Sequence, residues 1–149
     1  LIGLVPVSLF AIPLFGVSIY EIGFILFALL INLHIFGITL GILVSSGLIR
    51  YGPAFENIAW ATLFLLAPLG CIYYPIEILP DWLQSVAKSL PLVYIFEEVR
   101  NILIYQTYSL INIFKATMIT FLYFSTAVFI FYIAFEKSRE KGTLMNMGE

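Results

Sequence analysis

Four long stretches of this chain contain no Asp, Glu, Lys or Arg, and they constrain its fold more than any other feature. About 20 apolar residues in a helix cross the ~30 Å hydrocarbon core of a bilayer, so each stretch is long enough to span a membrane. The expected spans are residues 1–20, 22–49, 57–76 and 116–135. They predict an all-α fold, a polytopic transmembrane helical bundle with four spans.

The first two expected spans are not simple straight helices. Pro6 and Pro13 should kink the first span, where neighbouring helices satisfy the freed carbonyls. A helix over residues 22–49 would reach ~42 Å, which exceeds the bilayer core. We expect this second span to tilt, to bend near Gly37 or to project from the membrane.

Composition excludes several classes of protein. Only 11% of the 149 residues are charged, against about 25% in a soluble domain, which excludes a soluble enzyme. A net charge of −2 provides no cationic field for nucleic acid. With one Cys and one His, an intramolecular disulfide and a Cys/His metal cluster are impossible. There is no phosphate-binding glycine loop and no activated nucleophile, so we expect no catalytic residue, cofactor or metal on this chain.

Basic residues near the span ends predict the orientation in the membrane. With four crossings, one side holds Arg50, Lys137, Arg139 and Lys141 and the other holds Lys88, Arg100 and Lys115. The first group lies directly at span ends, which places it and the tail of residues 136–149 in the cytoplasm. The loop of residues 75–110 is then extracellular.

This loop combines prolines with two amphipathic patterns. Pro75, Pro80 and Pro91 divide it into pieces too short to cross a bilayer. In each piece the apolar residues form one helical stripe: Trp82, Leu83, Val86, Ala87 and Leu90, then Leu92, Phe96, Val99 and Leu103. Asp81 follows Pro80 at the expected helix start, where a carboxylate suits the helix dipole. The pattern predicts a pair of short helices that form a re-entrant or interfacial hairpin.

Glu97 and Arg100 are three residues apart on the second short helix, a spacing that allows an ion pair. At membrane depth such charges need pairing or water. The alternative is a solvated helix face that contributes little to stability.

Within the second span, the small residues Gly37, Gly41 and Ser45 recur every four positions and predict close approach of another helix. That helix belongs either to the same subunit or to a second one. His34 is a functional candidate by its place in a span, or else a neutral side chain bonded to a neighbouring helix. Without a carboxylate in any span, we predict no proton relay.

The order of these features resembles a known family. Tyr74-Pro75, Leu79-Pro80 and Leu90-Pro91-Leu92, followed by Glu97 and Arg100, resemble the segment between the last two spans of type-2 ATP-binding-cassette (ABC) exporter permeases. That family includes drug-efflux, lipid-exporting and polysaccharide-exporting members. Leu90-Pro91 stands where the polysaccharide exporters often have Asn-Pro, which weakens that assignment.

The resemblance implies a six-span protein of the cell membrane, of which this chain would provide the third to sixth spans. It further implies a second permease copy, membrane lipid, and a separate ATPase subunit that holds ATP and Mg²⁺. By the same resemblance, the short loop after the second span contacts the ATPase through Arg50, Tyr51, Gly52, Pro53, Phe55 and Glu56. The aromatic rings of this loop would otherwise serve as membrane anchors.

Two alternative functions make different demands on the sequence. An integral membrane enzyme that processes lipids would need clustered polar groups at one membrane face, for which the chain offers only Glu97, Glu98 and Arg100. A secondary transporter fragment would need ionisable groups deep in the spans or an internal repeat, and the sequence shows neither.

Overall fold

The computed structural model describes residues 19–140, and this part of the chain is all-helical, as the sequence predicts. Its elements are α2 (Ile19–Tyr51), α3 (Phe55–Leu69), the short 3-10 helix η1 (Ile76–Ile78), α4 (Asp81–Ala87), α5 (Pro91–Tyr105) and α6 (Leu110–Glu140). Residues 1–18 of the first expected span and the tail from residue 141 lie outside the described residues.

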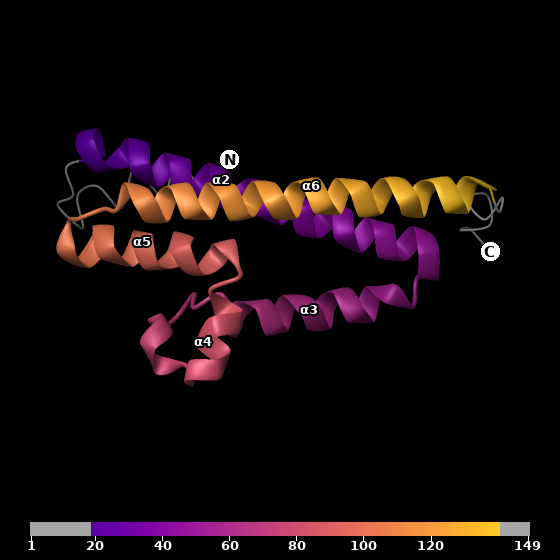
Figure 1. The fold of residues 1–149 in the computed structure, drawn as a ribbon, viewed down its shortest axis with the longest axis horizontal. Helices are drawn as coiled ribbons and strands as arrows, with labels where there is room; N and C mark the ends of the chain where they lie inside the picture. The colour runs from indigo at the N-terminus through magenta and orange to yellow at the C-terminus, as the bar shows by residue number, and fades with distance from the viewer. Residues whose placement is uncertain (1–18, 141–149) are drawn as a thin grey trace.

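The two longest helices are long and apolar enough to cross a membrane. α2 has 33 residues and α6 has 31, which correspond to ~50 Å and ~46 Å. They lie side by side and run in the same direction (Figure 1). Near the middle the Phe36 and Tyr123 rings meet edge to face at 5.9 Å, and near the C-terminal ends the Ser138 hydroxyl donates to the Ile49 carbonyl at 3.3 Å. The basic ends of both helices therefore lie at the same end of the molecule.

Small and weakly polar residues line the contact between α2 and α6. The buried residues on the two helices include Asn32, Thr39 and Ser46 of α2 and Ala116, Thr120, Ala127 and Ala134 of α6. The Thr39 and Ser46 hydroxyls donate to carbonyls of their own helix, at 2.8 and 2.7 Å. The hydroxyl protons of Thr39 and Ser46 thus have acceptors inside an apolar bundle, and the small size of both residues lets the two helices approach closely.

The third expected span differs from the observed helix. α3 has 15 residues, or ~22 Å, and ends at Leu69 instead of continuing to residue 76. Pro68 stands in its last turn, and Cys71 adopts a left-handed conformation with φ 53°, so the chain turns away there. Four full-length spans are therefore not confirmed.

α5 continues the return path that α3 begins. In Figure 1, α3 runs back from the common C-terminal end of α2 and α6, and α5 runs on in the same direction to the level where α6 begins. Buried apolar residues hold α5 against the two long helices: Leu29, Ile95, Ile102 and Ala116.

α4 projects from the junction between α3 and α5. It packs on this junction through a separate cluster of buried residues: Cys71, Ile76, Leu79, Ala87 and Val93. The predicted pair of short helices in this loop is confirmed.

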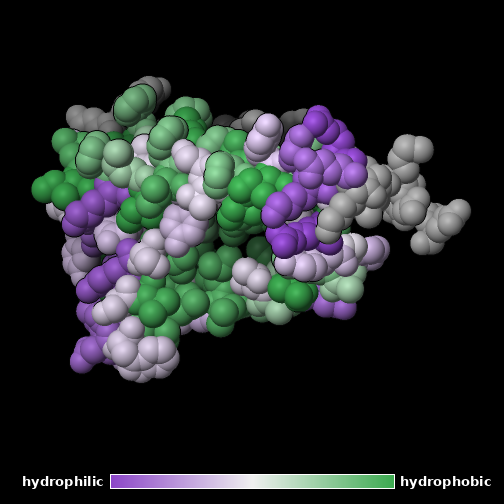
Figure 2. Space-filling model, turned by 45° about the vertical axis from the view of Figure 1, so that its right-hand side comes forward, coloured by the Kyte–Doolittle hydropathy of each residue, from purple (hydrophilic) through white to green (hydrophobic). Residues whose placement is uncertain are grey.

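The described helices expose much apolar side-chain surface. Large apolar side chains stand exposed on the helices, among them Phe24 at 79%, Phe64 at 76% and Phe121 at 67%. In Figure 2 the hydrophobic surface fills the middle of the face in view, while hydrophilic residues gather toward its two ends. An apolar band between polar ends is typical of a protein that lies in a bilayer.

Candidate functional site

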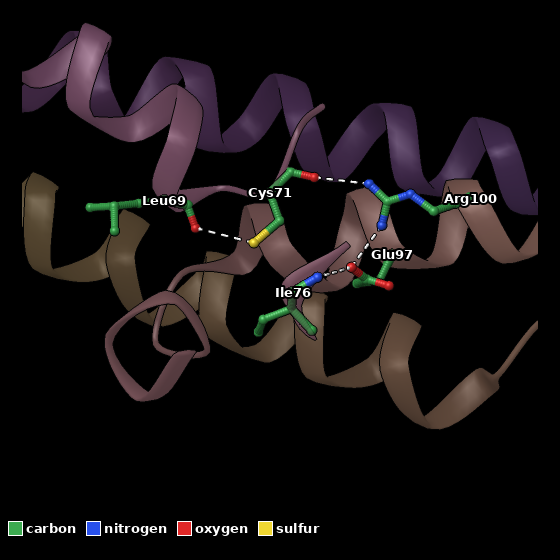
Figure 3. A network of polar contacts seen from close by, with 5 residues as sticks. All are labelled: Leu69, Cys71, Ile76, Glu97 and Arg100. Atoms are coloured by element: carbon green, nitrogen blue, oxygen red, sulfur yellow. Dashed lines mark hydrogen bonds and ion pairs between the residues drawn. The ribbon is translucent and has the colours of Figure 1, made fainter. Parts of the chain in front are cut away.

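Glu97 and Arg100 tie the loop after α3 to helix α5 (Figure 3). Arg100 Nη1 lies 2.7 Å from Glu97 Oε1, and their side chains are 21% and 22% exposed. The same Glu97 oxygen accepts a hydrogen bond from the Ile76 backbone amide at 3.0 Å, and Arg100 Nη2 donates to the Cys71 carbonyl at 3.1 Å. The ion pair allowed by the spacing is present, and it also clamps both ends of the segment from Cys71 to Ile76.

The local sequence explains why these two side chains face the loop. Leu90 is extended and Pro91 begins α5, because proline suits the first helical turn and disfavours a helical residue before it. Glu97 and Arg100 then lie one turn apart on the same side of α5. Charge-assisted hydrogen bonds to backbone groups, largely shielded from water, contribute more than a solvated surface pair.

Glu98 is a second polar anchor, which the sequence interpretation had treated only as part of a polar cluster. Its side chain is fully buried, with 0% exposure. One carboxylate oxygen accepts from the Ser109 backbone amide and the other from Asn112 Nδ2 at 3.1 Å. Glu98 thus satisfies donors at the start of α6, where helix N–H groups lack partners. The available signal was an acidic residue in a helix with an extended apolar stripe, since buried carboxylates require partners.

The other predicted hairpin residues shape the turn. The Tyr74 hydroxyl donates to the Pro68 carbonyl at 2.7 Å. Pro75 is extended before η1, Leu79 is buried in the α4 cluster, and Pro80 immediately precedes α4. These residues fold the chain back on itself between α3 and α5.

Cys71 lies under this turn and is 0% exposed. Burial raises the pKa of its thiol, the Glu97 carboxylate raises it further, Arg100 opposes this shift, and Glu77 adds a smaller increase. The thiol therefore stays protonated at neutral pH.

The predicted ATPase-coupling residues surround the turn between α2 and α3. Tyr51 ends α2, and Gly52 takes φ 74°, a conformation that favours glycine. The Tyr51 and Phe55 rings stack with centroids 5.9 Å apart, and the Arg50 guanidinium lies 5.5 Å from the Tyr51 ring centre. Pro53 and Glu56 are exposed.

Only one of the two rings in this turn is largely open to a partner. The Phe55 ring packs onto Gly47, where an added Cβ would lie 2.1 Å from Phe55 Cε1. Tyr51 is 64% exposed. A contact with another subunit would therefore be made mainly by Tyr51.

The small residues Gly37, Gly41 and Ser45 do not form the contact with α6. All three are exposed, and an added Cβ at Gly37 or Gly41 would meet nothing within 4 Å. Among residues 19–140, no helix covers this face of α2. His34 is also exposed, and its Nδ1 lies 2.9 Å from the Leu30 carbonyl of the same helix.

The charged groups Glu97, Glu98 and Arg100 of the hairpin are occupied by contacts with backbone groups. The described part of the chain contains no group of three or more His, Cys, Asp or Glu side chains placed to hold a metal ion. No protein-family model, curated protein or solved structure matches this chain. Its function is therefore inferred from its own residues.

Proposed function

We propose that this chain is the membrane-spanning permease part of a type-2 ABC exporter, and that it lines the pathway for a drug, lipid or polysaccharide-like substrate. The observation that supports this most is the proline-bounded hairpin from Pro75 to Tyr105, which Glu97 and Arg100 clamp beside two parallel apolar helices. In this proposal the protein is a multi-pass protein of the cell membrane, and it works with a second permease copy.

The mechanism would be alternating access. Closure of separate ATP-hydrolysing subunits moves the helices between two arrangements, and the chain provides pathway walls without bond chemistry. The turn of residues 71–76 would move together with α5, because Glu97 and Arg100 of that helix hold both ends of the turn. Tyr51 lies at the opposite end of α3, where a partner subunit would act.

Two separate observations argue against the two alternative functions. A lipid-processing enzyme would need uncommitted acids or bases, whereas Glu97, Glu98 and Arg100 each bind backbone groups. A secondary transporter would need ionisable groups inside its spans, and the longest uncharged stretch, residues 22–49, holds only His34.

The test uses the full-length protein, purified from its membrane together with any ATPase subunit that copurifies with it and reconstituted in liposomes. We expect ATP-dependent movement of a fluorescent phospholipid or of ethidium across the bilayer. Tyr51→Ala should lower the transport-coupled ATPase rate several-fold while assembly is retained. Tyr108→Ala is the matched control, since Tyr108 is 53% exposed at the other end of the molecule. Absence of ATP-dependent movement of both probes would overturn the proposal.

A further inference from the structure

An open cavity of about 340 Å³ lies where α2, α3 and α6 meet. Its walls are Leu43, Ser46, Gly47, Arg50, Tyr51, Phe55, Ile130, Ile133 and Ala134. Most of these residues are apolar, and the Ser46 hydroxyl is already bonded to the Ile42 carbonyl at 2.7 Å. A cavity near the lower end of the ~300–1,000 Å³ range for small-ligand sites suits a slender apolar group.

Arg50 is the one cationic residue of the described part of the chain that lines the cavity. Arg50 ends the uncharged part of α2, and its guanidinium lies beside the Tyr51 ring. Among residues 19–140, no carboxylate lines the cavity and no Asp or Glu forms a salt bridge with Arg50. An apolar cavity with an unneutralised guanidinium matches a molecule with an apolar tail and an anionic head.

The position of the cavity fits the boundary between acyl chains and headgroups. Ile130, Ile133 and Ala134 come just before the charged residues that begin at Glu136, and Leu43 and Ser46 come just before Arg50. Both helices therefore pass from apolar to charged sequence beside the cavity. Basic residues at such a level attract anionic lipids.

We infer that this cavity binds one anionic phospholipid, with an acyl chain against Leu43, Ile130 and Ile133 and the phosphate on Arg50. Gly47 makes room for the Phe55 ring, which forms part of the wall. This inference requires that the chain lies in a membrane, and it does not depend on the transport proposal. Bound lipid would occupy the cavity beside the α2–α3 turn, while the exposed part of Tyr51 stays open to a partner subunit.

The test is native mass spectrometry of the delipidated full-length protein, titrated with dioleoyl phosphatidylglycerol or dioleoyl phosphatidylcholine. We expect one tightly held phosphatidylglycerol per chain and weaker phosphatidylcholine binding. Arg50→Gln should weaken phosphatidylglycerol binding about fivefold, which corresponds to ~1 kcal/mol for one basic residue. Arg50→Lys should retain most of the preference, and Leu43→Trp, which fills the cavity, should weaken both lipids.

Lys137→Gln is the matched control, because Lys137 is an exposed cation at the same end of α6 and does not line the cavity. It should leave the tightly held lipid in place. Equal losses for Arg50→Gln and Lys137→Gln would mean diffuse surface attraction and overturn the site. Equal binding of the two lipids would overturn it as well, and so would unchanged binding in Leu43→Trp. All of these results are independent of ATPase activity, so failure of the lipid site is distinguishable from failure of the transport proposal.

Discussion

Two neighbouring glutamates, Glu97 and Glu98, contact different parts of the fold. Glu97 is partly exposed and has a cationic partner in Arg100. Glu98 is fully buried and accepts hydrogen bonds from Ser109 and Asn112, and it forms no salt bridge with a Lys or Arg among residues 19–140. One residue thus fixes the turn before α5, and the next fixes the connection to α6.

Glu98→Gln should destabilise the protein more than Glu97→Gln. The substituted side chain keeps one acceptor oxygen for two donors and turns an amide NH₂ toward the other, at a position with no solvent exposure. Leaving a buried donor unsatisfied costs about 1–3 kcal/mol, whereas the partly exposed position 97 regains contacts with solvent. The free energy of unfolding, measured by SDS titration in mixed micelles, should fall by about 1 kcal/mol more for Glu98→Gln. An equal or smaller loss would contradict the assigned anchor.

The Glu97–Arg100 pair should show measurable coupling. Glu97→Gln and Arg100→Gln each remove the pair and also weaken one backbone contact, to Ile76 and Cys71 respectively. Because both side chains retain about a fifth of their exposure, the coupling should be about 1 kcal/mol, between the values for surface and buried pairs. A double-mutant cycle on the free energy of unfolding measures it, and additive losses would reduce the two residues to independent anchors.

At the scale of elements, local signals predicted the starts of the two short helices α4 and α5, whereas the start of α6 at Leu110 lies six residues before the expected span. Pro80-Asp81 and Pro91 mark the beginnings of α4 and α5, because proline and an early carboxylate act within one helical turn. The end of α3 was placed too late, since the expected span ran to the residue before Glu77, whereas Pro68 and the turn at Cys71 end the helix. The uncharged stretch of residues 57–76 therefore gave only an upper limit for the length of α3, and the backbone turn after Leu69 determined where the helix ends.

The sequence did not predict which distant elements contact one another. The small residues Gly37 and Gly41 indicate that α2 can approach another helix, but their spacing does not identify the partner. The contact with α6 instead uses the face of Thr39 and Ser46. Likewise, nothing near Glu98 in the sequence indicates that its donors come from the next helix.

Gly47→Ala should destabilise the protein, whereas Gly41→Ala should not. A methyl group at position 47 would overlap the Phe55 ring and push it from α2, and such overpacking costs about 1–3 kcal/mol. At position 41 there is open space, so the higher helix propensity of alanine should leave stability unchanged or raise it by up to ~1 kcal/mol. SDS titration of both variants measures the difference. A destabilising Gly41→Ala in the full-length protein would indicate that another helix covers this face.

At the scale of the whole molecule, the parallel arrangement of α2 and α6 limits the possible topologies. Their C-terminal ends meet at Ile49 and Ser138, so Arg50 and Lys137 lie at one end of the molecule. α3 and α5 together return the chain to the other end, where α6 begins. Since the basic residues at the shared end favour the cytoplasm, the end where α6 begins should face the extracellular side, and the sequence predicts that α4 opens to the same side.

Single cysteines at Ser85 and Lys137 test this topology, because both side chains are exposed and lie on α4 and at the end of α6. Position 137 is preferable to position 138, since Ser138 is only 5% exposed. An impermeant maleimide added to intact cells should label Ser85→Cys and reach Lys137→Cys only after the cells are opened.

The unaltered chain is the control, because Cys71 is buried and its raised pKa leaves little thiolate at pH 7.4. It should stay unlabelled in both conditions, and labelling should appear only when denaturant exposes the thiol. As the pH rises, the unfolded chain loses this proton before the folded one does, so the contribution of the buried thiol to stability declines in alkaline solution. Labelling of position 137 but not 85 on intact cells would reverse the orientation, and would place the hairpin and its Glu97–Arg100 clamp on the cytoplasmic side.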